Sequence, residues 1–448
     1  MSNELIINST QNGCRIALLK DKNLIEYHED SGGERFMVGD IYLGTIKKIV
    51  PGLNAAFIDI GHEKDAFLHY LDLGPQFNTL QKFAILAQRG KFNGAKLDKF
   101  RNEPDISKHG KMTQVTSKGN KILVQVTKEP ISTKGPRLSC ELSLAGRYLI
   151  LVPFGKGINI SKKITKVEER KRLQRLITSI KPENFGIIIR TVAEGKDVAS
   201  LDADLRQLYS KWEEGVNRLK GAKPRAKVIG EMSVTSALLR DVLNESYDNI
   251  YVDDKEIHDE VKAYIKTIAP DKEKIIRAYQ NKVKIFENFG IEKQLKLAFG
   301  KSVSIKGGGY LIIEHTEALH VIDVNSGNKS SKEEDQEGTA LSVNIEAAKE
   351  IARQLRLRDM GGIIVVDFID LRKAENKKKV YDVMKEEMKE DRSKFTVLPL
   401  SKFGLMQITR QRVRPEMNIK TREVCPACEG TGKVTATILV SDQIEANI

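Results

Sequence analysis

Two apolar runs that each end in an acid, separated by a stretch of helical periodicity, constrain this chain more than any other feature. The runs are HVIDVNSGN (residues 320–328) and IIVVDFIDL (residues 363–371). Between them, apolar side chains recur at helical spacing over 341–357, and Gly361-Gly362 follows as a stop signal. This strand–helix–strand pattern predicts an α/β unit from residue 302 onward.

The polar ends of these two strands predict a metal site. Side chains alternate between the faces of a strand, so Asp323 and Asn325 project together, and Asp367 ends the second run. Ligand sites form at strand ends in α/β sheets. The oxygens of Asp323, Asn325 and Asp367 favour Mg²⁺ or Mn²⁺ over zinc, and such a cation can activate water against a phosphodiester. The alternative is that these acids cap loops or pair with nearby arginines.

Three residues close to these strand ends are expected to have structural or ordinary polar roles. Asp370 lies out of phase with Asp367, and we expect it to be structural. His315 and His320 flank the first strand. We expect ordinary polar contacts from both, with a role in substrate binding as the alternative.

The charge of the chain points to a polyanionic partner. The net charge is +13, and two separate zones are basic: residues 77–140 hold 13 Lys and Arg against 4 Asp and Glu, and residues 401–422 hold 6 against 1. This distribution favours nucleic acid first and an anionic membrane second. No apolar run approaches the roughly 20 residues that span a bilayer, and no secretory signal starts the chain, so we expect a cytoplasmic protein.

Residues 39–73 alternate short strands with Pro51-Gly52 and Gly61, which predicts a small antiparallel barrel. Alternation places Phe57 and Phe67 on its wetter face, where they would stack on bases; the alternative is that both belong to the core. Lys128, Lys134 and Arg137 follow in the next strand region and would contact phosphates. We expect residues 75–120, which are polar, basic and poor in periodicity, to form a long mobile loop.

The four cysteines are too few for a disulfide framework in 448 residues. Cys425 and Cys428 form a CxxC in CPACEGTG, the spacing of half a structural zinc site. Three completions stay open. Cys14 and Cys140 could fold back onto it, a second chain could contribute its own pair across a two-fold axis, or the pair could be a redox dithiol.

Taken together, these motifs resemble those of the ribonuclease E/G family of bacterial endoribonucleases. The resemblance covers nearly the whole chain, and the barrel segment looks closer to the G-type members. The matching stretches are GDIYLGTIKKIVPGLNAAFIDIGHEKDAFL, IIIRT, TEALHVIDVNSG, EAAKEIARQLRLRDMGGIIVVDFIDL, SKFGLMQITRQR and CPACEGTG.

The resemblance implies an α+β multidomain fold in which an RNase H-like subdomain is split around an inserted S1-type OB barrel. A 5′-sensor region, a DNase I-like α/β catalytic subdomain and a zinc link complete it. The implied segments are 1–38 (RNase H-like, first segment), 39–140 (S1-type barrel with the basic insertion), 141–231 (5′ sensor), 232–298 (RNase H-like, second segment), 299–420 (DNase I-like), 421–435 (zinc link) and 436–448 (tail).

The resemblance also implies site roles and partners. Asp323 and Asp367 would hold a catalytic Mg²⁺, with Asn325 assisting at the scissile phosphate. Arg190 and Thr191 of IIIRT would bind the 5′-monophosphate of the RNA. The RNA-contacting positions of the barrel would be Phe57, Phe67, Lys128 and Lys134.

Cys425 and Cys428 would join the same pair of a second chain through a structural Zn²⁺, giving a homodimer. The family usually continues into a small domain that pairs dimers into tetramers, whereas this sequence ends at SDQIEANI, so the sequence does not decide between dimer and tetramer.

The sequence therefore predicts a Mg²⁺-dependent endoribonuclease acting on single-stranded RNA, including rRNA precursors and mRNA, and leaving 5′-phosphate and 3′-hydroxyl ends. Two alternatives remain open at this point. One is a non-catalytic RNA-binding or assembly protein that uses the barrel alone. The other is a DNA-directed nuclease, because the metal chemistry does not distinguish the sugar.

Overall fold

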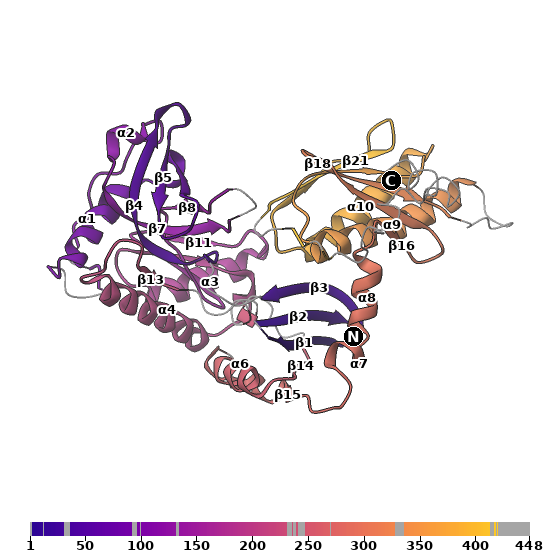
Figure 1. Cartoon of the computed structure of the whole chain (residues 1–448), viewed down its shortest axis with the longest axis horizontal. Coiled ribbons are helices and arrows are strands. Elements are labelled where there is room, and N and C mark those ends of the chain that lie inside the picture. The colour runs from indigo at the N-terminus through magenta and orange to yellow at the C-terminus, as the bar shows by residue number, and fades with distance from the viewer. Residues whose placement is uncertain are drawn as a thin grey trace, which may run out of the picture. The chain divides into compact units, whose positions relative to one another are not determined.

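The computed structural model describes most of the chain, in two compact units: residues 1–291 with 411–415, and residues 292–410 with 416–448 (Figure 1). The residues described are 2–11, 13–30, 36–91, 96–98, 100–130, 134–230, 235, 239–240, 247–268, 270–327, 336–412, 416–417 and 419. Within these ranges, no helix is both long enough and apolar enough to cross a bilayer. Mixed α and β structure is present throughout, as expected.

The first sheet of unit 1 joins the start of the chain to residues more than 200 positions later. Strands β1 (Asn3–Thr10), β2 (Gly13–Lys20) and β3 (Asn23–Asp30) form an antiparallel meander, while β14 (Asn249–Val252) and β15 (Ile276–Ala278) add to it in parallel. Helices α6 (Lys255–Ile268) and α7 (Ile285–Asn288) accompany this sheet. The assignment of these segments as RNase H-like stays a prediction.

The next sheet closes into a five-stranded barrel, which confirms the predicted small barrel. Its strands are β4 (Ile41–Val50), β5 (Ala55–Asp59), β6 (Ala66–His69), β7 (Lys121–Lys128) and β8 (Arg137–Ser139), and the ring closes because β7 pairs with β4. All pairings are antiparallel except that between β6 and β8. A sixth strand, β13 (Lys227–Ile229), lies against β4. Closure of five strands is typical of OB-like domains.

The prediction of a mobile loop over 75–120 is wrong for the residues nearest its start. Residues 77–88 form helix α1 (Phe77–Gln88), which buries Phe77, Leu80 and Phe83 against the barrel core. A short helix, α2 (Met112–Val115), follows. The side chain of Asn54 holds this stretch to the barrel, donating to the carbonyl of Gly110 and accepting from the amide of Met112. The sequence did indicate this helix, because apolar residues recur at helical spacing at 77, 80, 83, 84 and 87, although the surrounding segment is basic.

Residues 144–219 form a four-stranded sheet and two helices. The strands β9 (Leu144–Ala145), β10 (Leu149–Pro153), β11 (Ile158–Ile160) and β12 (Phe185–Ile189) lie in the order β11-β12-β10-β9, with α3 (Val167–Ile180) and α4 (Val198–Leu219). The carboxylate of Asp204 ties α4 to this sheet, accepting hydrogen bonds from the backbone amides of residues 147–149. Trp212 of α4 stacks on Phe83 and so joins α4 to the core of the barrel.

Unit 2 contains the predicted strand–helix–strand unit. Its six-stranded sheet has the order β16 (Ser302–Ser304), β17 (Tyr310–His315), β18 (Leu319–Asn325), β19 (Gly362–Asp367), β21 (Leu405–Arg410), β20 (Phe395–Val397). Strands β18 and β19 are parallel neighbours, and α9 (Gln336–Leu357) connects them. Helix α10 (Ala374–Glu387) packs against α9, and α8 (Ile291–Ala298) precedes the sheet.

Short 3₁₀ helices fill several connections of both units. They are Pro51–Leu53, Tyr70–Asp72, Thr191–Ala193, Pro270–Ile275 and Met388–Glu390. The core of unit 2 lies between its sheet and α9, where Ala347, Ile351 and Leu355 are completely buried. This packing fixes the ends of β18 and β19, the point at which the sequence predicts chemistry.

Candidate functional site

The two predicted acids lie directly beside each other at the ends of β18 and β19. In the parallel ladder Asp323 is paired in register with Asp367. Adjacent strands lie about 4.8 Å apart, so both carboxylates leave the sheet from neighbouring backbone positions. Along β18, Ile322 and Val324 are buried while Asp323 and Asn325 are only half-buried, which confirms that the two polar residues share the wetter face. The carboxamide nitrogen of Asn325 donates to Asp323 Oδ2 at 2.8 Å.

The acids at this edge act on one another electrostatically. Burial, then the negative charges of Asp323 and Asp370, raise the pKa of the Asp367 carboxyl above its usual range. Asp370, which we expected to be structural, therefore adds to the negative field at Asp367. Across the described ranges no lysine or arginine forms an ion pair with any of these three acids, so the alternative of arginine pairing finds no support there.

This donor set suits a hard divalent cation. Two carboxylates and a carboxamide offer only oxygen ligands, and Mg²⁺ keeps several waters and needs few protein ligands. Carboxylates that repel each other without a basic partner are stabilised when a cation binds between them. The residues present therefore fit a Mg²⁺ or Mn²⁺ site, although the roles of Asp323, Asn325 and Asp367 stay predictions.

Two residues that sequence reasoning missed hold the loop after Asp367 in place. Asn344 of α9 is fully buried, donating to the carbonyl of Ile369 at 2.7 Å and accepting from its amide at 3.0 Å. Glu337, at the start of α9, accepts from the amides of Arg372 and Lys373. The signal for Asn344 was a polar residue within the otherwise apolar face of a helix, where a carboxamide must find partners.

The barrel carries the predicted aromatic pair on its outer face. Phe57 and Phe67 are opposite each other on β5 and β6, half-buried, with ring centroids 5.9 Å apart in an edge-to-face arrangement. Their neighbours Ile58 and Leu68 are completely buried. The predicted faces are thus confirmed, and the alternative in which both rings belong to the barrel core is wrong.

Basic side chains continue this barrel face. Arg137 of β8 lies opposite Phe67 on one side and Lys128 of β7 on the other. Its guanidinium forms an ion pair with Asp72 at 2.9 Å. Lys134 is exposed, three residues before β8. Phe57 and Phe67 therefore lie on adjoining strands, β5 and β6, whereas Lys128 lies on β7, with Arg137 of β8 between Phe67 and Lys128.

Arg190 and Thr191 directly follow strand β12, and Thr191 begins the 3₁₀ helix Thr191–Ala193. The Arg190 guanidinium donates to the carbonyl of Gly146 at 2.6 Å, and the Thr191 hydroxyl lies 2.9 Å from that of Ser161. Thr191 is exposed and Arg190 is half-buried. Thr191 thus meets Ser161, which follows β11, whereas the Arg190 guanidinium reaches Gly146, which precedes β10 on the other side of β12.

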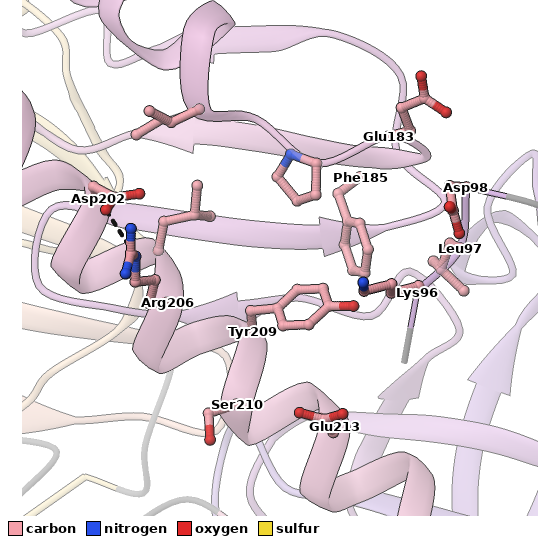
Figure 2. A pocket seen from close by; sticks show the side chains of 13 residues that line it. Lys96, Leu97, Asp98, Glu183, Phe185, Asp202, Arg206, Tyr209, Ser210 and Glu213 are labelled. Carbon is pink, nitrogen blue, oxygen red and sulfur yellow. Dashed lines mark ion pairs between the residues drawn. The ribbon is translucent and has the colours of Figure 1, made fainter. Parts of the chain in front are cut away.

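A hollow of about 690 Å³ lies near this region but does not contain the two residues. It opens between β12 and α4 (Figure 2) and is lined by Lys96, Leu97, Asp98, Ile180, Pro182, Glu183, Phe185, Asp202, Leu205, Arg206, Tyr209, Ser210 and Glu213. Phe185 and Tyr209 contact each other edge-to-face on its wall, with centroids 5.8 Å apart, and Arg206 pairs with Asp202 (Figure 2). Acids outnumber bases along this lining, which does not suit a phosphate.

The cysteine motif lies outside the described residues, so the structure does not test a zinc site at Cys425 and Cys428. Cys14 and Cys140 are both buried, in the core of the first sheet and of the barrel respectively. The two cysteines belong to separate hydrophobic clusters, so the described structure does not bring their thiols together at one site. The fold-back completion of the site therefore loses its support.

Comparisons with known proteins agree with these features. Residues 143–413 match the model of the Ribonuclease E/G family. Ribonuclease G of Haemophilus influenzae is 34% identical over 445 residues, covering 99% of this chain and 87% of that protein. Ribonuclease G of Escherichia coli K12 is 33% identical over 448 residues, covering 100% and 88%. Ribonuclease E of Haemophilus influenzae is 34% identical over 434 residues, covering 96% and 44%.

Proposed function

Because the chain belongs to the ribonuclease E/G family and is an endoribonuclease, we propose that it hydrolyses single-stranded RNA at a Mg²⁺ site on the ends of β18 and β19. The observation that carries this proposal is the register of the two strands, which pairs Asp323 with Asp367 and leaves both acids without a basic partner among the described residues.

Each residue at the ends of β18 and β19 would have a separate role in hydrolysis. Asp323 and Asp367 would hold the cation. When bound, Mg²⁺ would supply an activated water and neutralise charge on the phosphodiester. The Asn325 carboxamide, which donates one hydrogen to Asp323, would fix the orientation of that carboxylate and keep a second N–H for a phosphate oxygen. Asn344 and Glu337 would keep the loop after Asp367 in one position. The products would carry 5′-phosphate and 3′-hydroxyl ends.

The outer face of the barrel would hold the RNA strand. Phe57 and Phe67 offer two aromatic faces to bases, and Lys128 and Lys134 offer cations to phosphates. Stacking tolerates any base, so this face would select for single strands more than for sequence. Substrates of this kind include rRNA precursors and mRNA, and processing of rRNA and decay of mRNA are the proposed cellular roles.

Arg190 and Thr191 would recognise a 5′-monophosphate. A guanidinium provides fork-shaped donors for phosphate oxygens, and the exposed Thr191 and Ser161 hydroxyls add further donors. Binding would require Arg190 to share its hydrogen bond to Gly146 with the phosphate. Cys425 and Cys428 would join two chains through a shared structural Zn²⁺, giving a homodimer.

One assay tests the central proposal. The full chain is incubated with 5′-monophosphorylated single-stranded RNA, its 5′-hydroxyl counterpart and DNA of the same sequence, in Mg²⁺ or in EDTA. We expect RNA cleavage in Mg²⁺ only, faster on the monophosphorylated strand, and no cleavage of DNA. Cleavage that persists in EDTA would refute the metal site, and equal rates on the two RNAs would refute the 5′-phosphate role alone.

A further inference from the structure

Two histidines and a glutamate of unit 2 converge on one point away from the candidate Mg²⁺ site. His315 ends β17, His320 lies near the start of β18, and Glu416 follows the last strand. One ligand atom from each of the three residues lies within 4.8 Å of the others. The polar contacts that we expected for His315 and His320 are therefore present, and a carboxylate that the sequence did not connect to them completes a cluster.

The hairpin between β17 and β18 fixes the two imidazoles. His315 and His320 are directly opposite each other in the antiparallel ladder, so their side chains share one face of the sheet. Their Nδ1 atoms are 2.8 Å apart. The turn is tight, because the Thr316 hydroxyl donates to the carbonyl of Leu319 at 2.7 Å and accepts from its amide at 3.0 Å.

The tautomer of His320 leaves its Nδ1 available to act as a ligand. Its Nε2 lies 3.1 Å from the carbonyl of Gly361, and a carbonyl only accepts, so Nε2 carries the hydrogen. In the neutral ring, Nδ1 then has a lone pair directed at His315. Histidines that bind metals usually donate their other N–H to a backbone carbonyl or carboxylate in this way, which sets the ring orientation.

The carboxylate is held at the same point. Glu416 Oε1 lies 3.2 Å from His315 Nδ1, and Oε2 lies 3.8 Å from His320 Nε2. The amide of Met417 donates to the carbonyl of Arg358 at 2.9 Å, which anchors the backbone beside Glu416. Ligands of a tetrahedral zinc ion with bonds of 2.0–2.1 Å are separated by about 3.3 Å, close to the 2.8 and 3.2 Å found between the Nδ1 atoms and between His315 and Glu416.

We propose that His315, His320 and Glu416 form a binding site for a borderline divalent cation, best suited to Zn²⁺. Two imidazole nitrogens and one carboxylate oxygen are a ligand set that zinc accepts, with the fourth position left to water. This choice separates the site from the candidate Mg²⁺ site, which offers only oxygens. The cation would clip residue 416 to the β17–β18 hairpin, on the face of β18 opposite to Asp323.

The surrounding charges bear on the affinity of this site. Burial lowers the pKa of His315 against the opposing charge of Glu416, which favours the neutral ring that a metal needs. The Arg358 guanidinium nearby repels a cation, although it is already engaged by the carbonyls of Ala298 and Gly300. We therefore expect weaker binding than at a site of three unopposed ligands.

Cobalt titration of the full chain tests the proposal. Cys425 and Cys428 are both replaced by Ser, so that no thiolate site remains, and excess Mg²⁺ occupies the oxygen site. We expect about one Co²⁺ per chain with visible d–d bands of nitrogen and oxygen ligation, displaced by Zn²⁺. In the same background His315→Ala and Glu416→Gln should each lose these bands, while His109→Ala, at an exposed histidine of unit 1, should keep them.

Thermal unfolding provides the second measurement. In EDTA the variants His315→Ala and Glu416→Gln should unfold like their parent, which shows that both fold. Zn²⁺ should raise the Tm of the parent and of His109→Ala but not of these two variants, because only a bound ligand stabilises the folded state. Unchanged cobalt bands in either His315→Ala or Glu416→Gln, or no cobalt bands in the parent, would overturn the proposal.

Discussion

The outer face of the barrel and the acidic edge of β18 and β19 differ in how their charged side chains are paired. On the barrel, acids and bases neutralise each other: Lys47 pairs with Asp65 at 2.6 Å, and Arg225 pairs with Asp59 at 2.7 Å. Although burial raises it, the hydrogen bond from Arg225 brings the pKa of Asp59 below its usual value. At the acidic edge the pKa of Asp367 is raised instead.

This difference agrees with the two proposed roles, in which the barrel face would hold RNA and the acidic edge would carry the reaction. Paired charges would give the barrel face a stable shape, and its lysines and aromatic rings would bind an RNA strand of any sequence. Acids without a basic partner lower the stability of the folded state. The pairing of β18 with β19 and the packing of α9 against the sheet nevertheless hold Asp323 and Asp367 next to each other. Such uncompensated groups are typical of functional sites.

The largest effect that this comparison predicts is on catalysis. Asp323→Asn and Asp367→Asn should each lower the RNA cleavage rate by about 10³-fold or more, because each removes a charged ligand worth several kcal/mol to the metal-dependent step. RNA affinity, measured by fluorescence anisotropy, should change little. The matched control is Asp382→Asn, at an exposed acid of α10, which should cleave like the parent. Parental rates in both site variants would remove the contrast between the two regions.

The barrel should show the reverse behaviour. Phe57→Ala and Phe67→Ala should each weaken binding of single-stranded RNA by about 5- to 150-fold, the equivalent of 1–3 kcal/mol of stacking. Cleavage at saturating RNA should remain near the parental rate. Val167→Ala, at an exposed apolar residue of α3, is the control. If both phenylalanine variants bind as tightly as this control, the RNA-holding role of the face is wrong.

A third prediction concerns the support of the acidic edge. Asn344→Ala removes two hydrogen bonds to the backbone of Ile369 and leaves buried groups unpaired, so we expect the free energy of unfolding to fall by about 1–3 kcal/mol. Cleavage should also fall, with RNA affinity intact. Lys349→Ala, on an exposed turn of α9, should cost no more than about 0.5 kcal/mol. Equal losses in the two variants, from urea titrations, would show that Asn344 anchors nothing.

The smallest predicted effect is on the free energy of unfolding of an Asp367 variant, and its sign tests whether the ionised carboxylate destabilises the fold. A raised carboxyl pKa means that the folded state prefers the protonated acid, so ionised Asp367 destabilises the fold and this cost appears as pH rises through the shifted value. In EDTA at neutral pH, Asp367→Asn should therefore increase the free energy of unfolding by less than about 1 kcal/mol. The gain should vanish at low pH, and Mg²⁺ should stabilise the parent more than the variant. A loss of stability in EDTA would show that Asp367 is satisfied by its neighbours.

The sequence predicted those regions of the molecule that depend on local periodicity. Alternation along a strand placed Phe57, Phe67, Asp323 and Asn325 on the correct faces, and helical spacing found α9. Helix α1 was missed because its apolar positions are embedded in a basic, Gly-containing segment that reads as a loop. The basic composition of this segment predicted a loop, whereas the helical spacing of its apolar residues predicted the helix that the structure contains.

Local periodicity does not predict contacts between segments that are distant in the sequence. The buried bond from Asn344 to Ile369 and the meeting of Glu416 with the His315–His320 pair both depend on tertiary packing. A polar residue in an apolar helical face was the available signal for Asn344. Nothing near Glu416 in the sequence marked it, because its partners lie about a hundred positions earlier.

The register between β18 and β19 has a consequence for how this protein can vary through evolution. Side chains alternate with a period of two, so inserting or deleting a single residue inside either strand would turn its terminal acid toward the hydrophobic interior and expose an isoleucine or valine in its place. Replacements within the two strands can accumulate, whereas changes of length there cannot. The length of these two strands must therefore be inherited unchanged.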